Sequence, residues 1–140
     1  TFQTGYPLAI GAQANQVQAF SGARPNIQPG ASATLPSDQR SIARWFDTSV
    51  FSQPAQFTFG NVARTLPDTR APGLRNYDIS LLKNTGITER VSLQLRFEAF
   101  NAFNRANFGS PGTNLGNPQF GVISSTGPAR VIQVASQVIF

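Results

Sequence analysis

The sequence contains no cysteine and no histidine among its 140 residues. Without cysteine, the chain can form no disulfide, no thiolate metal site and no cysteine nucleophile. Without histidine, it lacks the commonest general base and a common zinc ligand. The six carboxylates lie apart along the chain, so no acid and base pair and no Asp-rich calcium loop is visible. We therefore expect a protein that is not an enzyme, with no catalytic residues, no metal site and no cofactor.

Charged residues are also scarce, at 12% of the sequence against about 25% in an average soluble domain. The net charge of +5 comes from arginines that occur singly and from one lysine, Lys83. A nucleic-acid-binding surface usually gathers its basic residues in a patch or stripe, so we expect no nucleic-acid partner. No apolar run approaches the roughly eighteen residues that cross a bilayer as a helix.

The clearest pattern in the sequence is a strict alternation that begins at Val91. Apolar residues occupy Val91, Leu93, Leu95, Phe97 and Ala99, and polar residues occupy the four positions between them. Successive side chains of a strand point to opposite faces, so the pattern predicts a strand over 89–104 with one apolar face. Leu93, Phe97 and Phe100 would also share one side of a helix. We favour the strand because no helix cap precedes Arg90.

Two neighbouring segments show the same period. Residues 77–84 alternate with Tyr77, Ile79 and Leu81 on one face, and Thr85-Gly86 has the composition of a hairpin turn before the next strand. Residues 129–140 form the last predicted strand, with an apolar face of Ile132, Val134, Val138 and Phe140 that Ser136 interrupts. We predict that these strands pair in an antiparallel sheet, with Arg96 and Glu98 pointing away from Leu93, Leu95 and Phe97.

The first half of the chain is less regular. We predict a strand over 5–13, with Pro7 at its first residue or at a sheet edge because proline lacks a ladder donor, and a second strand over 16–20. Residues 21–37 are rich in Gly, Pro and Ser, which predicts a loop. Residues 38–45 are compatible with a helical turn capped by Ser37. The aromatic residues of 38–75 predict a small apolar cluster, with a ligand-binding aromatic platform as the alternative.

The fold class is therefore all-β, with antiparallel strands and long ordered loops in one domain. Its parts are an N-terminal strand region (1–20), a long loop region (21–76) and C-terminal antiparallel strands (77–140).

A set of spaced residues in the second half carries a family resemblance. They are Phe100-Asn101, Phe103-Asn104, Asn107-Phe108-Gly109, Pro111, Asn114-Leu115, Phe120-Gly121, Ile123, Arg130, Ile132-Gln133 and Phe140. A second set lies upstream: Trp45-Phe46-Asp47, Phe51, Phe59-Gly60-Asn61, Arg64, Pro72-Gly73, Asn76, Asp78, Ser80 and Lys83-Asn84. Together they resemble the C-terminal part of the Oar-like TonB-dependent receptors, outer-membrane proteins with a carboxypeptidase-regulatory-like N-terminal domain.

The resemblance implies that the strands are the last ones of a large transmembrane barrel that takes up substrates with energy from the TonB complex. Val91, Leu93, Leu95 and Phe97 would then face outer-membrane lipid, and the polar residues between them would line a wet interior. Phe140 is similar to the terminal signature that the barrel assembly machinery recognises. The chain shows no plug domain and no TonB box, so no transport residue of the family can be carried over.

Four or five predicted strands are too few for a barrel, which needs about eight. We therefore expect a partial barrel that is completed either by a longer parent chain or by other copies. The first hypothesis is a part of an uptake transporter whose function resides in the full receptor. The second is a non-catalytic structural subunit that assembles by strand pairing into a tube or filament, in the outer membrane or outside the bacterial cell. A soluble sugar-binding or nucleic-acid-binding β domain is a third alternative.

We favour the second hypothesis and expect a homo-oligomer or polymer. The strand over 129–140 has a free outer edge without Lys or Pro after Val131, and such an edge favours pairing with another chain. Its partner would be the segment 5–13 of another copy. The predicted assembly residues are Val131, Ile132, Val134, Val138, Phe140, Tyr6, Leu8 and Ile10.

Overall fold

A computed structural model describes residues 1–13 and 23–140 of the chain. This described part contains nine strands and no helix, so the all-β prediction is confirmed. The predicted strand over 16–20 lies outside the described residues. Strands pair antiparallel in one three-stranded and three two-stranded sheets, and none of these sheets closes into a barrel. The fold is therefore a partial barrel with long ordered loops.

The chain divides into two compact units. The first, which we call the sheet unit, consists of Thr1–Gln3, Leu74–Asn107 and Gly127–Phe140. The second, the loop unit, consists of Thr4–Gly73 and Phe108–Thr126. No helix in the described residues is long and apolar enough to cross a membrane.

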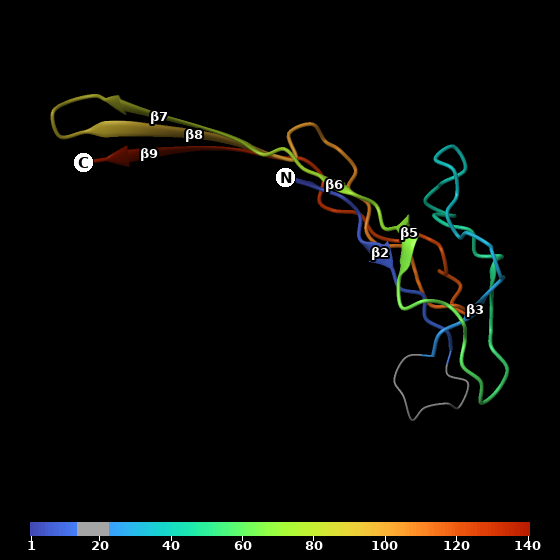
Figure 1. Cartoon of the computed structure of the whole chain (residues 1–140). Coiled ribbons are helices and arrows are strands. Elements are labelled where there is room, and N and C mark those ends of the chain that lie inside the picture. Colours follow the sequence, from blue (N-terminus) through green and yellow to red (C-terminus); the bar gives the residue numbers. More distant parts are fainter. Residues whose placement is uncertain (14–22) are drawn as a thin grey trace. The chain divides into compact units, whose positions relative to one another are not determined.

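Three long strands form the sheet unit: β7 (Ile79–Gly86), β8 (Ser92–Phe100) and β9 (Val131–Ile139). They pair antiparallel in the order β7-β8-β9, with β8 in the centre, and Figure 1 shows them side by side as three extended arrows. Two short strands of the same unit, β1 (Phe2–Gln3) and β6 (Leu74–Arg75), pair with each other antiparallel. The predicted antiparallel strands are thus confirmed, with ends that differ by a few residues.

The turn between β7 and β8 lies two residues later than predicted. Thr85 and Gly86 belong to β7, where they pair with Leu93 and Ser92. The chain reverses after them, where the backbone amides of Ile87 and Thr88 both donate to the carbonyl oxygen of Val91. The Thr88 hydroxyl accepts a further bond from the Val91 amide at 3.1 Å. This hydroxyl satisfies a donor of the turn, so the hairpin closes around Thr88 and not at the glycine.

The opposite end of β8 is set by asparagine. The predicted strand ran to Asn104, but β8 ends at Phe100 because Asn101 has φ 49° and Asn104 has φ 50°. Asparagine is among the few side chains that adopt this left-handed conformation readily. The Asn101 side chain is buried and donates to the carbonyl oxygens of Arg105 and Pro128 at 3.0 and 3.2 Å. Its own oxygen accepts the Arg105 amide at 2.9 Å.

The loop unit contains only short strands. These are β2 (Pro7–Leu8), β3 (Asn26–Ile27), β4 (Phe51–Ser52) and β5 (Leu66–Arg70), paired as β2-β5 and β3-β4. The predicted strand over 5–13 is present only at Pro7 and Leu8 and is wrong at its other residues, and Pro7 is the first strand residue, which is one of the two places expected for it. The register shifts between Pro7 and Leu8, and the chain next forms only an isolated bridge, from Gly11 to Asn114.

The core of the loop unit forms around Phe46, which is fully buried. Its ring meets those of Phe51 and Phe120 edge to face, with centroid distances of 6.1 and 5.2 Å. The other buried core residues are Leu8, Ile10, Ala33, Val50, Val62 and Ala71. The predicted aromatic cluster is therefore present, but it also recruits residues far away in sequence.

Two of the aromatic residues assigned to that cluster lie outside it. Phe57 and Phe59 are exposed. The predicted helical turn over 38–45 is also wrong. The Gln39 amide bonds the Pro36 carbonyl and the Arg44 amide bonds the Ser41 carbonyl, which makes two separate turns without a continuing helical ladder.

Candidate functional site

The register of the three long strands creates one apolar face. Side chains of residues paired across neighbouring strands lie on the same face. Ile79, Ala99 and Ile132 form one row across the sheet, and Leu81, Phe97 and Val134 form the next. Two rows further along, Thr85, Leu93 and Val138 lie side by side. The alternation found in the sequence is therefore continuous across all three strands.

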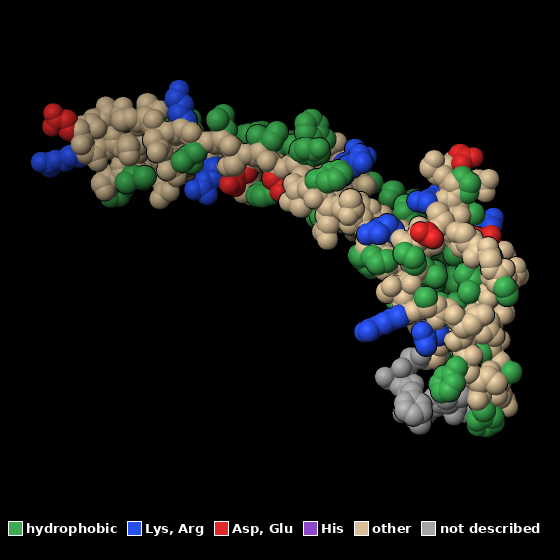
Figure 2. All heavy atoms as spheres, viewed as in Figure 1, with side chains coloured by type: hydrophobic (Ala, Val, Ile, Leu, Met, Phe, Trp, Pro, Cys, Tyr) green, Lys and Arg blue, Asp and Glu red, His purple; other side chains and the backbone are tan. Residues whose placement is uncertain are grey.

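Most of this apolar face is exposed. Leu81 is 65% exposed and Val134 73%, and Ile79, Ile132 and Val138 are each at least half exposed. Figure 2 shows hydrophobic side chains at the surface of the chain. Soluble proteins rarely leave a contiguous apolar surface of this kind in water, because its hydration is unfavourable. The face is therefore suited to an apolar environment.

One row of the apolar face is different. Lys83 on β7 and Ser136 on β9 both pair with Leu95 on the central strand, so a cation and a hydroxyl lie on either side of a leucine. A charge on a lipid-contacting surface is costly. The sequence signal for this position was already present, since Lys83 continues the series Ile79 and Leu81 at the strand period.

The opposite face is polar in its centre. Its central rows are Ser80, Glu98 and Gln133, then Leu82, Arg96 and Ala135, then Asn84, Gln94 and Gln137. Apolar residues lie at its two ends, where Phe100 pairs with Val131 and Ser92 pairs with Ile139. The Gln133 amide donates to the Glu98 carboxylate, and the Gln94 amide donates to the Asn84 side-chain oxygen at 3.0 Å. Arg96 and Glu98 thus lie away from Leu93, Leu95 and Phe97, as the alternation predicts.

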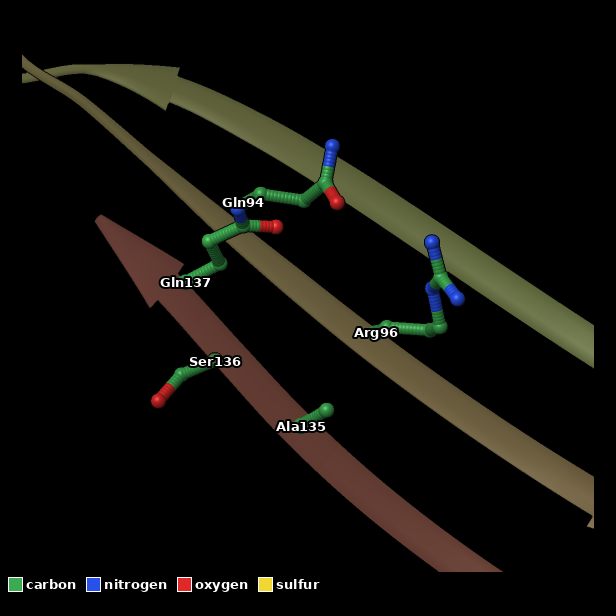
Figure 3. A pocket seen from close by; sticks show the side chains of 5 residues that line it. All are labelled: Gln94, Arg96, Ala135, Ser136 and Gln137. Carbon is green, nitrogen blue, oxygen red and sulfur yellow. The ribbon is translucent and has the colours of Figure 1, made fainter. Parts of the chain in front are cut away.

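A shallow hollow lies over β8 and β9. It is lined by Gln94, Arg96, Ala135, Ser136 and Gln137 and has a volume of about 340 Å³. Figure 3 shows Gln94 and Arg96 on the same side of β8. Sequence analysis did not single out this hollow, because it depends on which β9 residue faces Arg96.

The dimensions of the strands fit a bilayer. Each of β8 and β9 has nine residues, which extend over about 30 Å at the usual rise of a strand. A membrane-crossing strand needs about 9–11 residues when it is tilted. β8 and β9 are therefore long enough to cross the hydrocarbon core of a membrane, and β7, with eight residues, is one residue shorter.

Both edges of the three-stranded sheet are open in the described residues, since β7 and β9 each pair with β8 alone. Of the predicted assembly residues, Val131, Ile132, Val134 and Val138 are exposed on β9, and Phe140 follows it. Tyr6 is exposed in the loop unit. Leu8 and Ile10 are buried in the core of that unit, and Leu8 already pairs with Leu66. Leu8 and Ile10 are therefore covered by their own unit, whereas the outer edge of β7 is open in the described residues.

The described residues contain no group of three or more His, Cys, Asp or Glu side chains that could hold a metal ion. In the loop unit, the Asp47 carboxylate accepts hydrogen bonds from two neighbouring residues. Hydrogen bonds from the Ser49 hydroxyl and amide, together with the Arg44 guanidinium at 2.9 Å, hold the pKa of the Asp47 carboxyl below its usual range. This cluster closes a local turn.

An antiparallel sheet with one exposed apolar face, one polar face and strands of membrane-spanning length is the pattern of a membrane-inserted β-sheet. Comparison with protein families gives the particular family: residues 1–133 match the model described as outer membrane beta barrel domain. The chain belongs to this family, and its location is the outer membrane. No curated protein and no solved structure matches the chain significantly.

Proposed function

We propose that the sheet unit is a segment of the wall of a β-barrel in the bacterial outer membrane, and that the barrel is an uptake receptor of the TonB-dependent kind. In this proposal the chain has no catalytic role. The observation that carries it is the exposed apolar face of β7, β8 and β9, with Glu98, Arg96 and Gln94 on the opposite face. The family match supports the barrel, and the resemblance described above supports the receptor.

The apolar face would contact lipid and the polar face would line the interior. Lipid removes the cost of exposing Leu81 and Val134 to water, and the interior leaves Arg96 and Glu98 hydrated. Three strands enclose nothing, because a barrel needs about eight. The outer edges of β7 and β9 would therefore pair with further strands of the wall, which also satisfies their backbone donors and acceptors.

The orientation of the two faces can be tested by single-cysteine scanning, which needs no background substitutions because the sequence has no cysteine. Spin labels would be placed in turn at residues 93–98 and 132–137 of the full chain in outer-membrane lipid vesicles. We expect labels at Leu93, Leu95 and Phe97 to be relaxed by oxygen dissolved in the bilayer, and labels at Gln94, Arg96 and Glu98 by an aqueous nickel complex. Equal aqueous relaxation at all positions would contradict the proposal.

A second candidate function is assembly into a tube or filament outside the cell or in the membrane. The observation that favours it is the open outer edge of β9, which has no Lys or Pro between Val131 and Phe140. Head-to-tail pairing of β9 with β7 of another copy would join identical subunits through different surfaces, and such contacts form rings or helical filaments. The partner in this case is another copy of the chain.

Photo-crosslinking distinguishes the two candidates. A photoreactive amino acid at Val138 on β9 would be activated in the outer membranes of cells that make the protein. In the receptor, the strand beside β9 belongs to the same polypeptide, so the crosslinked product keeps the mass of one chain. In the assembly, the product has the mass of two chains or more. For the assembly, deletion of residues 134–140 should also abolish particles seen by negative-stain microscopy, and unchanged particles would rule it out.

A further inference from the structure

We propose that Arg96, with the amides of Gln94 and Gln137, forms a binding site for an oxyanion group, a carboxylate or a phosphate, on the polar face of the sheet. The inference rests on the proposed barrel, because it assigns this face to the interior through which solutes pass. The solute expected in that interior carries a carboxylate or a phosphate group.

The strand register puts a small side chain, Ala135, between longer ones on the polar face. Arg96 pairs with Ala135 on β9, while Gln94 pairs with Gln137 in the adjacent row of the same face. A methyl group therefore lies where the flanking rows carry long amide side chains. The hollow of about 340 Å³ lies at this place, between Arg96, Gln94 and Gln137 (Figure 3). Its volume exceeds that of an inorganic phosphate ion and leaves room for part of a larger solute.

The charge in the hollow is uncompensated. In the part of the chain that the structure describes, no ion pair and no hydrogen bond involves the Arg96 guanidinium, and the one ion pair there joins Arg44 to Asp47. Glu98 lies on the same face two residues away, but its carboxylate accepts the amide of Gln133 and it does not line the hollow. This acid therefore leaves the guanidinium available to a ligand.

The chemistry of these groups matches an oxyanion. A guanidinium presents parallel N–H donors that fit two oxygens of a carboxylate or phosphate. A glutamine amide adds further N–H donors. Gln94 uses one of its two N–H donors on the Asn84 side-chain oxygen and keeps the other, and Gln137 has no hydrogen bond to another side chain in the described residues. Leu82, on the other side of Arg96, contributes no competing acceptor. An anionic solute would therefore gain one charge-assisted contact and additional amide contacts in one place.

Replacing Glu98 should change the anion affinity in the opposite direction from replacing Arg96. Its negative charge lies near the site, so it should weaken anion binding by repulsion, and its removal should tighten binding. Arg90 in the turn between β7 and β8 supplies the matched control for loss of one positive charge, because it lies outside the hollow.

Inorganic phosphate and citrate are suitable probes, titrated into the isotope-labelled full chain in detergent micelles at low salt. The nuclear magnetic resonance signals of the Arg96 Nε and the Gln94 and Gln137 amides report binding at the site itself. We expect saturable shifts of these signals, an affinity at least about tenfold lower for Arg96→Gln, a higher affinity for Glu98→Gln, and no change for Arg90→Gln. Shifts of the Gln94 and Gln137 amides that are equal in Arg96→Gln and the parent chain, or an equal loss of affinity in Arg90→Gln, would overturn the proposal.

This measurement is independent of membrane insertion. If the spin-label scan contradicts the barrel wall while phosphate still binds at Arg96, the site stands and its place in a solute path fails. If the scan supports the wall while phosphate does not bind, the barrel stands and the oxyanion site fails.

Discussion

Lys83 and Ser136 lie on the same face of the sheet, on either side of Leu95, within a largely apolar surface. Apolar residues continue on both sides of this row, from Ile79 at one end to Val138 at the other, with Thr85 as the polar exception. If this face contacts lipid, the ammonium group must extend its four-carbon stem towards water or towards the Ser136 hydroxyl. The row is the least favourable part of the proposed lipid surface.

Replacing Lys83 by leucine should therefore stabilise the chain in a bilayer. Lysine at mid-membrane depth on a barrel costs about 2–4 kcal/mol, so we expect Lys83→Leu to raise the free energy of unfolding from lipid vesicles by about 2 kcal/mol, measured by urea titration. The control is Lys83→Arg, which keeps the charge and should give no gain. A destabilised leucine variant would show that Lys83 has a required polar partner.

Leu95 and Gln94 are adjacent on β8 but belong to opposite faces, so they offer a direct comparison. Leu95→Asp puts a carboxylate on the apolar face and should prevent stable insertion or folding. Gln94→Asp changes the polar face and removes the hydrogen bond that the Gln94 amide donates to Asn84. We expect this loss to lower the stability of the folded chain by about 1 kcal/mol. Recovery of folded protein from the membrane fraction measures both. Equal recovery of the two variants would mean that the faces do not differ in environment.

Asn101 ends β8 through both its backbone and its side chain. Asn101→Ala should destabilise the sheet unit by about 3 kcal/mol, because it leaves the Arg105 amide without its acceptor and forces alanine into a left-handed conformation. Asn101→Gly loses the same bonds but tolerates the backbone, so it should recover about 1 kcal/mol. Circular dichroism during denaturant unfolding compares them. Identical midpoints would show that the backbone conformation contributes nothing.

Phe46 and Phe59 test where the core of the loop unit lies. Phe46 is fully buried among Phe51 and Phe120, so Phe46→Ala should cost about 3–5 kcal/mol. Phe59 is 71% exposed, and Phe59→Ala should change stability by less than about 0.5 kcal/mol. Fluorescence of the single tryptophan, Trp45, reports unfolding of this unit. Similar losses in both variants would place Phe59 in a packed environment.

Asp47 predicts an acid-sensitive loop unit. Its pKa is lowered in the folded chain by the Ser49 hydrogen bonds and by Arg44, so it stabilises the fold above the unfolded pKa of about 3.9. That contribution should disappear as the pH falls from about 5 through the folded pKa. In Asp47→Asn the unfolding midpoint, followed by Trp45 fluorescence, should depend less on pH over this range. An unchanged dependence would assign the acid sensitivity to other carboxylates.

Much of the sheet unit was determined by the sequence itself. Period two over Val91 to Ala99 and over residues 131–139 fixes which side chains share a face, because a strand offers only two directions. That is why Leu93, Leu95 and Phe97 lie together and why Arg96 and Glu98 lie opposite them. The same rule failed at Gly5 to Gln13, where proline and glycine interrupt the ladder and the side chains are held by packing against distant residues.

Strand register, the ends of the strands and the core of the loop unit depended on the tertiary structure, because local sequence patterns carry no information about distant residues. Register is a relation between strands, and only the pairing of β8 with β9 sets Ala135 opposite Arg96 and opens the hollow beside it. The turn around Thr88 depends on one hydroxyl that reaches a backbone amide, and the end of β8 depends on the bonds of Asn101 to Arg105 and Pro128. The core of the loop unit brings together Leu8, Phe46 and Phe120, which span more than a hundred residues of sequence. Burial of apolar surface lowers the free energy of the folded chain whatever the separation of the residues in sequence.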